Sequence, residues 1–313
     1  MQQDAKRRFL ASLPNLKENM QAIDRLYNAI KTKNNPTAVG LDTSPEFLPE
    51  QMQAKIASFA DAAGLITEFN VNLIDRLSPI IPAVKVQVAY YEMLGIEGML
   101  AFRETLRYAK SKGLITIADV KRNDIGSTAG AYSKAYLPDG AAFEADFITV
   151  NPYLGVDGIT PFLQDCAKYG KGIFVLCKTS NPASGELQDK KLCGGTTTLY
   201  QRVAKLISTW GKELTGSCGY SSVGAVVGAT HPEQAAQIRK THPGLFFLIP
   251  GYGAQGGGAK DIACCFDKNG MGGIVNNSRG ILTAYKKYPK LNYADAAFEA
   301  ALAMQKDLST VKQ

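Results

Sequence analysis

The amino-acid sequence predicts an α/β protein, specifically a (β/α)8 or TIM barrel with an N-terminal helical extension. Eight short apolar runs alternate with eight helical patterns along the chain, which indicates a parallel sheet. At least one of these runs is apolar on both faces, as expected of a strand that helices cover on the outside. The count of eight favours a closed barrel over an open, doubly wound sheet.

Each predicted strand is a short apolar run, and several of these runs are rich in β-branched residues. In chain order the strands are expected at 37–42, 83–88, 114–121, 146–151, 172–178, 223–229, 245–250 and 272–276. The segments between them show apolar residues at helical spacing or a helix start signal. Helices are therefore expected at 51–78, 95–112, 126–137, 157–168, 196–213, 232–240, 259–264 and 292–309.

The chain of 313 residues is interpreted as one barrel domain, 37–313, preceded by the helical extension 1–36. A barrel of about 250 residues with terminal extensions accounts for this length. Two helices are expected in the extension, where they would cover the bottom of the barrel. Their apolar residues are Phe9, Leu13 and Leu16 in the first helix, and Ile23, Leu26, Tyr27 and Ile30 in the second.

Composition excludes several classes of protein. Hydrophobic residues make up 45% of the chain and charged residues 20%, which is ordinary for a soluble protein, and no apolar run is long enough to span a membrane. No apolar segment follows the basic residues at 6–8, so we expect no secretory signal. We therefore expect a cytoplasmic location. The net charge of +7 is spread along the chain, which favours a small anionic substrate over nucleic acid.

The six cysteines show no C-x-x-C spacing, so reduced thiols are expected rather than disulfides or a zinc site. The two histidines, His231 and His242, both precede proline in loop-like segments. We interpret them as structural, and we expect neither a metal cluster nor a Ser-His-Asp triad.

The stretch 119–124, with the sequence DVKRND, places two carboxylates and an ammonium group directly after an apolar run. Residues two apart in a strand share a face, so Asp119 and Lys121 are expected on one side, with Asp124 just beyond, where the strand turns. The opposite face is mostly apolar, which predicts a strand buried on both sides. Buried charges are uncommon without a function, so we favour a catalytic site over an exposed ion pair at a sheet edge.

Two earlier strands also end in polar residues. Asp42 is either a site residue or the N-cap of the turn 43–45, and both interpretations stay open. Lys85 and Gln87 share the face of their strand opposite three valines, which places a lysine either inside the barrel or on a surface edge strand. The charged stretch 119–124 on the next strand favours the interior.

Two later loops have the composition of binding loops. About fifteen residues without clear secondary structure follow Lys178, a length typical of lids and ligand-binding loops. The glycine-rich segment 250–258 follows the seventh predicted strand, and Arg279 follows the eighth. The loops after these two strands are the recurrent phosphate site of such barrels, and bare backbone amides with a guanidinium suit a phosphate dianion.

Taken in order, these motifs resemble the orotidine 5′-monophosphate decarboxylases, specifically the longer-chain branch of that family. The similarity runs from about Thr37 to Ile281 and does not extend to 1–36 or to the details of 183–196. It rests on Gly40-Leu41-Asp42, Lys85, Asp119-Val120-Lys121-Arg122-Asn123-Asp124-Ile125-Gly126-Ser127-Thr128, Thr179-Ser180-Asn181-Pro182, Gly253-Ala254-Gln255-Gly256-Gly257 and Ser278-Arg279-Gly280.

The resemblance implies a reaction: orotidine 5′-monophosphate, a nucleotide, is converted to uridine 5′-monophosphate and carbon dioxide, the last step of de novo pyrimidine synthesis. It implies no cofactor and no metal. It also implies that Lys121 is the proton donor in a charge network with Lys85, Asp119 and Asp124. Asp119 would either destabilise the substrate carboxylate or orient Lys121 and keep it protonated, and the sequence does not choose between these roles.

The resemblance further implies a homodimer with shared active sites, in which Asp124 and Thr128 reach into the site of the partner subunit. The implied substrate contacts are Asp42 and Lys85 with the ribose hydroxyls, Ser180 with the pyrimidine, and Gln255 and Arg279 with the 5′-phosphate.

Two other functions stay open at this stage. Related barrels that act on sugar phosphates as decarboxylases or aldolases also carry Asp-x-Lys-x-x-Asp, sometimes with magnesium, but the Thr179-Ser180-Asn181 segment favours a nucleotide. A Schiff-base aldolase would need a neutral amine, whereas the candidate lysines are expected beside carboxylates. The third possibility is an inactive nucleotide-binding sensor, which the occupied catalytic positions disfavour.

Overall fold

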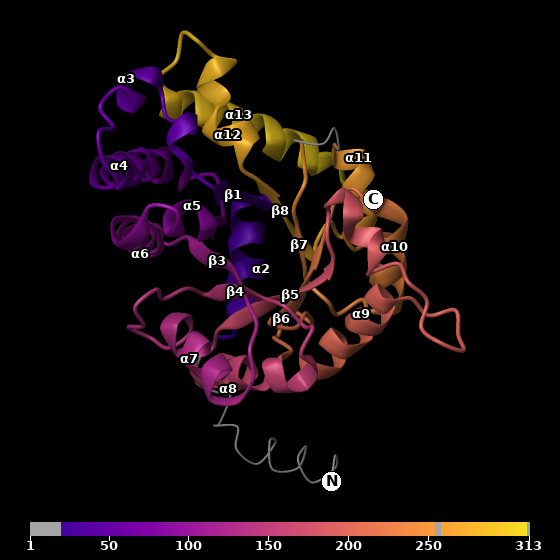
Figure 1. Ribbon diagram of the computed structural model, residues 1–313. Coiled ribbons are helices and arrows are strands. Elements are labelled where there is room, and N and C mark those ends of the chain that lie inside the picture. Colours follow the sequence, from indigo (N-terminus) through magenta and orange to yellow (C-terminus); the bar gives the residue numbers. More distant parts are fainter. Residues whose placement is uncertain (1–19, 254–257, 312–313) are drawn as a thin grey trace.

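The computed structural model describes residues 20–253 and 258–311. Its strands form a closed parallel barrel in which each strand pairs with the next along the chain and β8 pairs with β1 (Figure 1). The strands are β1 (Thr37–Leu41), β2 (Ala83–Gln87), β3 (Ile115–Arg122), β4 (Phe147–Val150), β5 (Gly172–Lys178), β6 (Val223–Val227), β7 (Phe247–Ile249) and β8 (Gly273–Asn277). The predicted barrel is confirmed, and each strand lies where the sequence predicts it.

The helices surround the barrel, and most of them match the predicted ranges (Figure 1). They are α2 (Ala22–Lys33), α3 (Glu50–Gln53), α4 (Phe59–Leu77), α5 (Ala89–Glu92), α6 (Gly95–Ser111), α7 (Gly126–Tyr136), α8 (Thr160–Tyr169), α9 (Leu199–Trp210), α10 (Pro232–Thr241), α11 (Ala259–Ile262), α12 (Arg279–Leu282) and α13 (Tyr293–Leu308).

Three predicted helices were wrong in extent. The range 51–78 contains two helices, because Ser58 begins α4 as its N-cap and its hydroxyl accepts the Asp61 amide at 3.1 Å. The range 196–213 is helical from Leu199 to Trp210 and ends in a separate 3-10 turn. The range 259–264 is the four-residue α11 followed by the 3-10 turn η5 (Ala263–Cys265).

Aromatic rings fill the barrel interior. Phe147 and Phe174 stack with their ring centroids 5.0 Å apart. Two strand glycines make room for these rings: a Cβ atom at Gly172 would lie 2.3 Å from Phe147, and one at Gly224 would lie 2.6 Å from Phe174. The interior below the site is therefore a packed core and not a channel.

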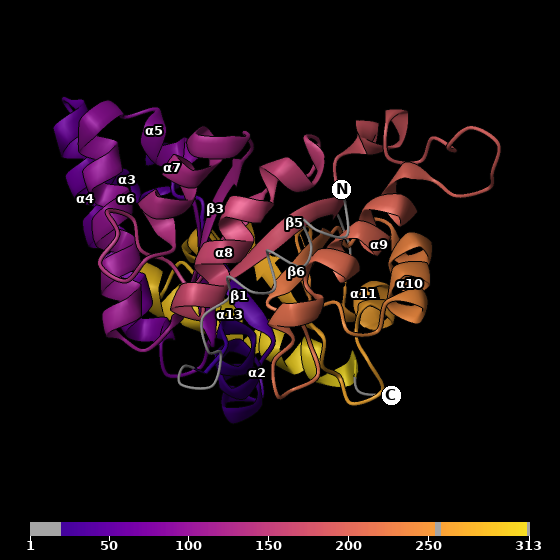
Figure 2. The same cartoon turned by 90° about the horizontal axis from the view of Figure 1, so that it is seen from below.

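The second predicted helix of the N-terminal extension is confirmed as α2, and it covers the amino-terminal end of the barrel. Ile23, Leu26 and Ile30 are buried in one apolar cluster with the interior side chains Ile115 and Phe147. Figure 2 shows α2 on the opposite side of the barrel from the long loop between β5 and α9. The first predicted helix, with Phe9, Leu13 and Leu16, lies outside the described residues.

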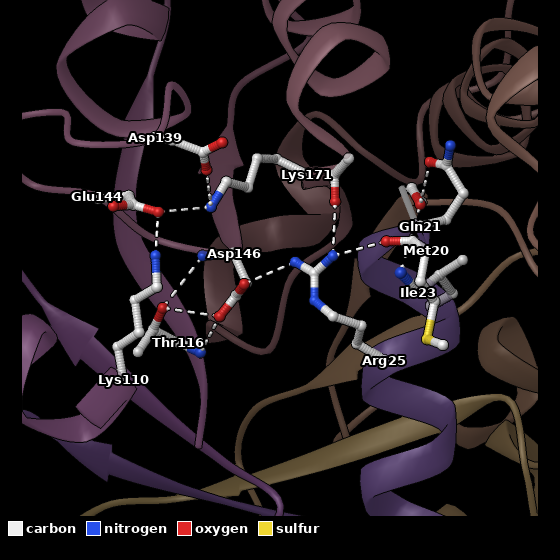
Figure 3. Close-up of polar contacts among 12 residues, drawn as sticks. Met20, Gln21, Ile23, Arg25, Lys110, Thr116, Asp139, Glu144, Asp146 and Lys171 are labelled. Carbon is white, nitrogen blue, oxygen red and sulfur yellow. Dashed lines mark hydrogen bonds and ion pairs between the residues drawn. The ribbon is translucent and has the colours of Figure 1, made fainter. Parts of the chain in front are cut away.

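A polar network ties α2 to the barrel (Figure 3). Arg25 pairs with Asp146 at 2.7 Å and donates to the carbonyl oxygen of Gly170 at 3.1 Å. The other Asp146 oxygen accepts the Thr116 amide at 3.0 Å. Asp146 therefore joins the start of β3, the start of β4 and the covering helix.

Replacing Asp146 with alanine is expected to lower the free energy of unfolding by about 3 kcal/mol, because it leaves the Thr116 amide without its acceptor and breaks a mostly buried ion pair. Urea unfolding would measure the change. Glu104→Ala is the control: its exposed carboxylate pairs with Arg103 on α6, and its loss should cost less than about 0.5 kcal/mol. Equal losses in the two variants would contradict this role of Asp146.

Candidate active site

A cavity of about 580 Å³ opens at the carboxyl-terminal mouth of the barrel, where the sequence predicts the site. Each strand, or the residues directly after it, contributes to the lining. The polar lining residues are Asp42, Lys85, Gln87, Asp119, Lys121, Thr149, Thr179, Ser180, Asn181, Gln188, Asn276, Asn277, Ser278 and Arg279. The volume is typical of a small-molecule site.

Alternating carboxylates and ammonium groups form a chain across one side of the cavity. Lys85 Nζ lies 3.0 Å from Asp42 Oδ1 and 2.9 Å from Asp119 Oδ2. Lys121 Nζ lies 2.6 Å from Asp119 Oδ1. The lysine of β2 thus points into the barrel, and the alternative of a surface edge strand was wrong.

This arrangement keeps the buried groups charged. Burial lowers the pKa of Lys85, but the charges of Asp119 and Asp42 outweigh it and raise the pKa above its usual value. Burial opposes ionisation of Asp119, but Lys85 and Lys121 hold the pKa of that carboxyl well below its usual range. At neutral pH the site therefore presents Lys85 as a cation and Asp119 as an anion.

Two further side chains complete the surroundings of Asp119. Gln87 donates to Asp119 Oδ2 at 2.9 Å, and the Thr149 hydroxyl donates to Asp119 Oδ1 at 2.8 Å. With Lys85 and Lys121, the carboxylate accepts from four donors. Gln87 could have been found from the sequence because it shares the inward face of Lys85, whereas no sequence signal marks Thr149.

Lys121 reaches Asp119 by a local irregularity and not by simple strand alternation. Its backbone is left-handed, with φ of 44°. The pairing of β3 with β4 shifts register between Ala118 and Arg122. The side chain remains 47% exposed while its ammonium contacts Asp119, so Lys121 stands at the rim of the cavity and is open to a ligand.

Asp42 lines the cavity, and its alternative interpretation as the N-cap of the turn 43–45 was wrong. Its carboxylate binds Lys85 and accepts the Ser278 hydroxyl at 2.8 Å, and Ser44 takes the N-cap position of the next turn. The contact requires glycine at position 40, since a Cβ atom there would lie 1.9 Å from Ser278 Oγ.

Asp124 and Thr128 do not line the cavity of their own chain. The Asp124 carboxylate accepts the following amide, that of Ile125, at 2.8 Å. Thr128 is exposed on the first turn of α7. Within one chain, the described residues join Lys85, Asp119 and Lys121 but leave Asp124 outside their network.

The loop after β5 is folded against the cavity. It contains the 3-10 turn η3 (Pro182–Glu186), and the Lys178 ammonium, fully buried, lies 3.0 Å from both Ser184 Oγ and Asp189 Oδ2. Gln188 accepts the Thr179 amide at 2.9 Å and so holds the segment that carries Ser180 at the cavity wall. Lys178 and Gln188 were not predicted as site residues.

The predicted phosphate residues lie beyond β7 and β8. Arg279 is exposed, lines the cavity and begins α12. Gln255 lies outside the described residues, as do residues 254, 256 and 257 of its glycine-rich segment. Tyr252, at the start of that segment, lines the cavity and donates its hydroxyl proton to Asp307 of α13.

The remaining predictions concern groups away from the cavity. The described residues contain no cluster of three or more histidine, cysteine or acidic side chains that could hold a metal ion. All six cysteines are free thiols.

His231 Nε2 lies 3.2 Å from Ser184 Oγ, and neither histidine lines the cavity. In 20–253 and 258–311, no helix is long and apolar enough to cross a membrane.

The closed barrel and the polar cavity at its carboxyl-terminal mouth define a (β/α)8-barrel enzyme. Within that class, the chain belongs to the orotidine 5′-phosphate decarboxylase / HUMPS family, whose model matches residues 38–291. Curated relatives named orotidine 5′-phosphate decarboxylase include one from Petrotoga mobilis, 44% identical over 92% of this chain and 98% of its own length. Another, from Clostridium acetobutylicum, is 46% identical over 85% of this chain and 90% of its own length.

Solved structures agree with this assignment. The Leishmania donovani OMP decarboxylase is 28% identical, with a TM-score of 0.71 over 94% of this chain and 99% of its own. The Leishmania donovani UMP synthase is 31% identical, with a TM-score of 0.72 over 92% of this chain and 57% of its own. The resemblance predicted from the motifs is confirmed.

Proposed function

We propose that this chain converts orotidine 5′-monophosphate to uridine 5′-monophosphate and carbon dioxide without a cofactor, with Lys121 as the proton donor. The observation that carries the proposal is the pair of ammonium groups, Lys85 and Lys121, held on one carboxylate beside a cavity of nucleotide size. Membership of the decarboxylase family supports the same substrate. Loss of substrate absorbance, with and without a chelator, tests it: no turnover would refute the activity, and inhibition by the chelator would refute the cofactor-free mechanism.

The chemistry accounts for these residues. Loss of carbon dioxide from C6 of the pyrimidine leaves an electron pair in an sp² orbital with little delocalisation. An ammonium fixed beside C6 stabilises that charge in the transition state and then transfers its proton to the carbon. Lys121 suits this role because its ammonium lies at the cavity rim and is only partly covered.

Asp119 supports this mechanism by orienting the two ammonium groups. Its four donors leave its carboxylate fully engaged before substrate arrives. Burial lowers the pKa of Lys85, but the negative charge of Asp119 helps to raise it and so keeps Lys85 protonated. Orientation of Lys121 is therefore the role that we propose for Asp119, in preference to repulsion of the substrate carboxylate.

The substrate is proposed to lie with its ribose hydroxyls at Asp42 and Lys85, its pyrimidine at Ser180 and its phosphate at Arg279 and Gln255. The cavity lining supports these contacts for Asp42, Lys85, Ser180 and Arg279. Arg279 is exposed, and a guanidinium can bind two phosphate oxygens at once. Binding energy from the distant phosphate can order the loops around C6.

Replacing Arg279 with alanine is expected to raise KM for the nucleotide about 100-fold, because a charge-assisted contact to the phosphate is lost. Orotidine, which lacks the phosphate, should be turned over equally by the variant and the wild type. Steady-state kinetics with both substrates measure this difference. Lys286→Ala, which removes an exposed cation nearby in the sequence, is the control and should behave as wild type. Equal losses on both substrates would contradict a phosphate contact.

The active sites are proposed to be shared across a homodimer, with Asp124 and Thr128 entering the partner's cavity. Exposed apolar side chains flank Asp124: Ile125 is 54% exposed, and Tyr153 and Val156, in the connection after β4, are 77% and 49% exposed. Gly158 brings this connection against the Asp124 backbone, because a Cβ atom there would lie 3.1 Å from the Asp124 carbonyl oxygen. An apolar surface of this kind fits a second copy of the chain.

The aldolase alternative is disfavoured by the charge state of Lys85. A Schiff base needs a neutral amine, whereas the neighbouring carboxylates raise the pKa of Lys85. Borohydride treatment in the presence of sugar phosphates would trap a Schiff base, and covalent labelling of Lys85 or Lys121 would favour the aldolase. We also propose a cytoplasmic location, which the reduced thiols expected from the cysteine spacing support.

A further inference from the structure

Thr149 of β4 makes three hydrogen bonds with a single hydroxyl group. The side chain is 1% exposed and points to the cavity mouth. Its oxygen accepts the amides of Val120 and Lys121, each at 2.9 Å, and its proton goes to Asp119 Oδ1 at 2.8 Å. One hydroxyl therefore contacts three consecutive residues of the catalytic segment.

The two backbone contacts lie at the irregular end of β3. Regular pairing with β4 is interrupted between Ala118 and Arg122. The backbone of Lys121 adopts the left-handed conformation, which residues other than glycine rarely take. A buried amide needs an acceptor. Thr149 supplies that acceptor for Val120 and Lys121, so its hydroxyl stabilises the turn that directs Lys121 along the cavity rim.

The third contact fixes the direction of the hydroxyl. A threonine hydroxyl has one proton and two lone pairs. Because the two amides occupy the lone pairs, the proton has one remaining direction, toward Asp119. The carboxylate oxygen that accepts it is the same oxygen that binds Lys121 Nζ. The Thr149 hydroxyl oxygen thus holds the Lys121 backbone directly and the Lys121 ammonium through Asp119.

We propose that Thr149 is a positioning residue, which sets the Lys121 ammonium relative to Asp119 for proton transfer. The proposal rests on the decarboxylase function given above. Thr149 itself contacts no reacting atom in this arrangement and acts through Asp119 and the backbone of Lys121.

The test compares Thr149→Val, which removes the hydroxyl at nearly constant volume, with Thr149→Ser, which keeps it. Thr149→Val should lower kcat about 100-fold, because a small displacement of a catalytic group has an effect of this size. KM and the affinity for uridine 5′-monophosphate should change less than about threefold, since the contacts to ribose and phosphate remain. Thr149→Ser should keep kcat within about threefold of wild type.

Thr37→Val is the matched control. Thr37 is also fully buried, at the start of β1, but its hydroxyl has no hydrogen-bond partner among the described residues. The control should leave kcat unchanged, which separates the Thr149 hydroxyl from buried threonines in general. If Thr149→Val does not fold, Thr149→Ala against Thr149→Ser makes the same comparison.

Unchanged kcat in Thr149→Val would overturn the proposal, and so would equal losses in the valine and serine variants, which would assign the effect to packing of the methyl group. A wild-type protein without decarboxylase activity would instead refute the proposed function. The two failures are therefore distinguishable.

Discussion

Lys121→Ala is expected to abolish decarboxylation, with kcat reduced by at least about 10⁴-fold, because the variant loses both the cation beside C6 and the proton donor. The protein should still fold. Lys121 is half exposed, and Asp119 keeps three of its four donors in the variant. Turnover of orotidine 5′-monophosphate and thermal unfolding would be measured on the same preparation.

The control for this variant is Lys134→Ala, which removes an exposed lysine from α7 and should leave turnover unchanged. Near wild-type turnover of Lys121→Ala would remove Lys121 from the mechanism. Affinity for uridine 5′-monophosphate should persist in the inactive variant, since the ribose and phosphate contacts come from other residues.

Mixing two inactive variants, Lys121→Ala and Asp124→Ala, is expected to restore activity. Each homodimer lacks one member in every site. In a mixed dimer, one site combines the intact Lys121 of one chain with the intact Asp124 of the other, while the second site carries both defects. Random exchange makes about half of the dimers mixed, so about a quarter of all sites should recover full activity.

The matched control mixes Lys121→Ala with Lys85→Ala. Both lysines contact the Asp119 of their own chain, so no mixed dimer can assemble an intact site, and activity should not return. Mass spectrometry would confirm subunit exchange in both mixtures. If exchange is complete and the Lys121 and Asp124 mixture stays as inactive as its parents, Asp124 acts within its own chain.

The network around Asp119 was only partly predictable from the sequence. Asp119 and Lys121 were expected together because they are two residues apart on a strand, and Lys85 because valines occupy the opposite face of its strand. Thr149 lies on a different strand and carries no pattern of its own. Its role depends on the register shift between β3 and β4, which is a property of two paired strands and not of either sequence alone.

Asp42 is a second case in which the sequence left two interpretations open and the tertiary structure chose between them. Its sequence fits both an N-cap and a site residue, because both uses need a carboxylate after a strand. Barrel closure decided between them, since β8 pairs with β1 and brings Ser278 to the Asp42 carboxylate. Gly40 is understood only then, as the position that leaves space for the Ser278 hydroxyl.

By itself, the sequence determined the alternation of strands and helices, the closed barrel and the strand ends at which charged groups gather. These depend on local periodicity and on the general rule that parallel barrels carry their sites at the carboxyl ends of strands. Only the tertiary structure decided which donors saturate Asp119 and how the left-handed backbone at Lys121 directs its side chain within β3. Those features depend on contacts between residues far apart in the chain, and periodicity carries no information about such contacts.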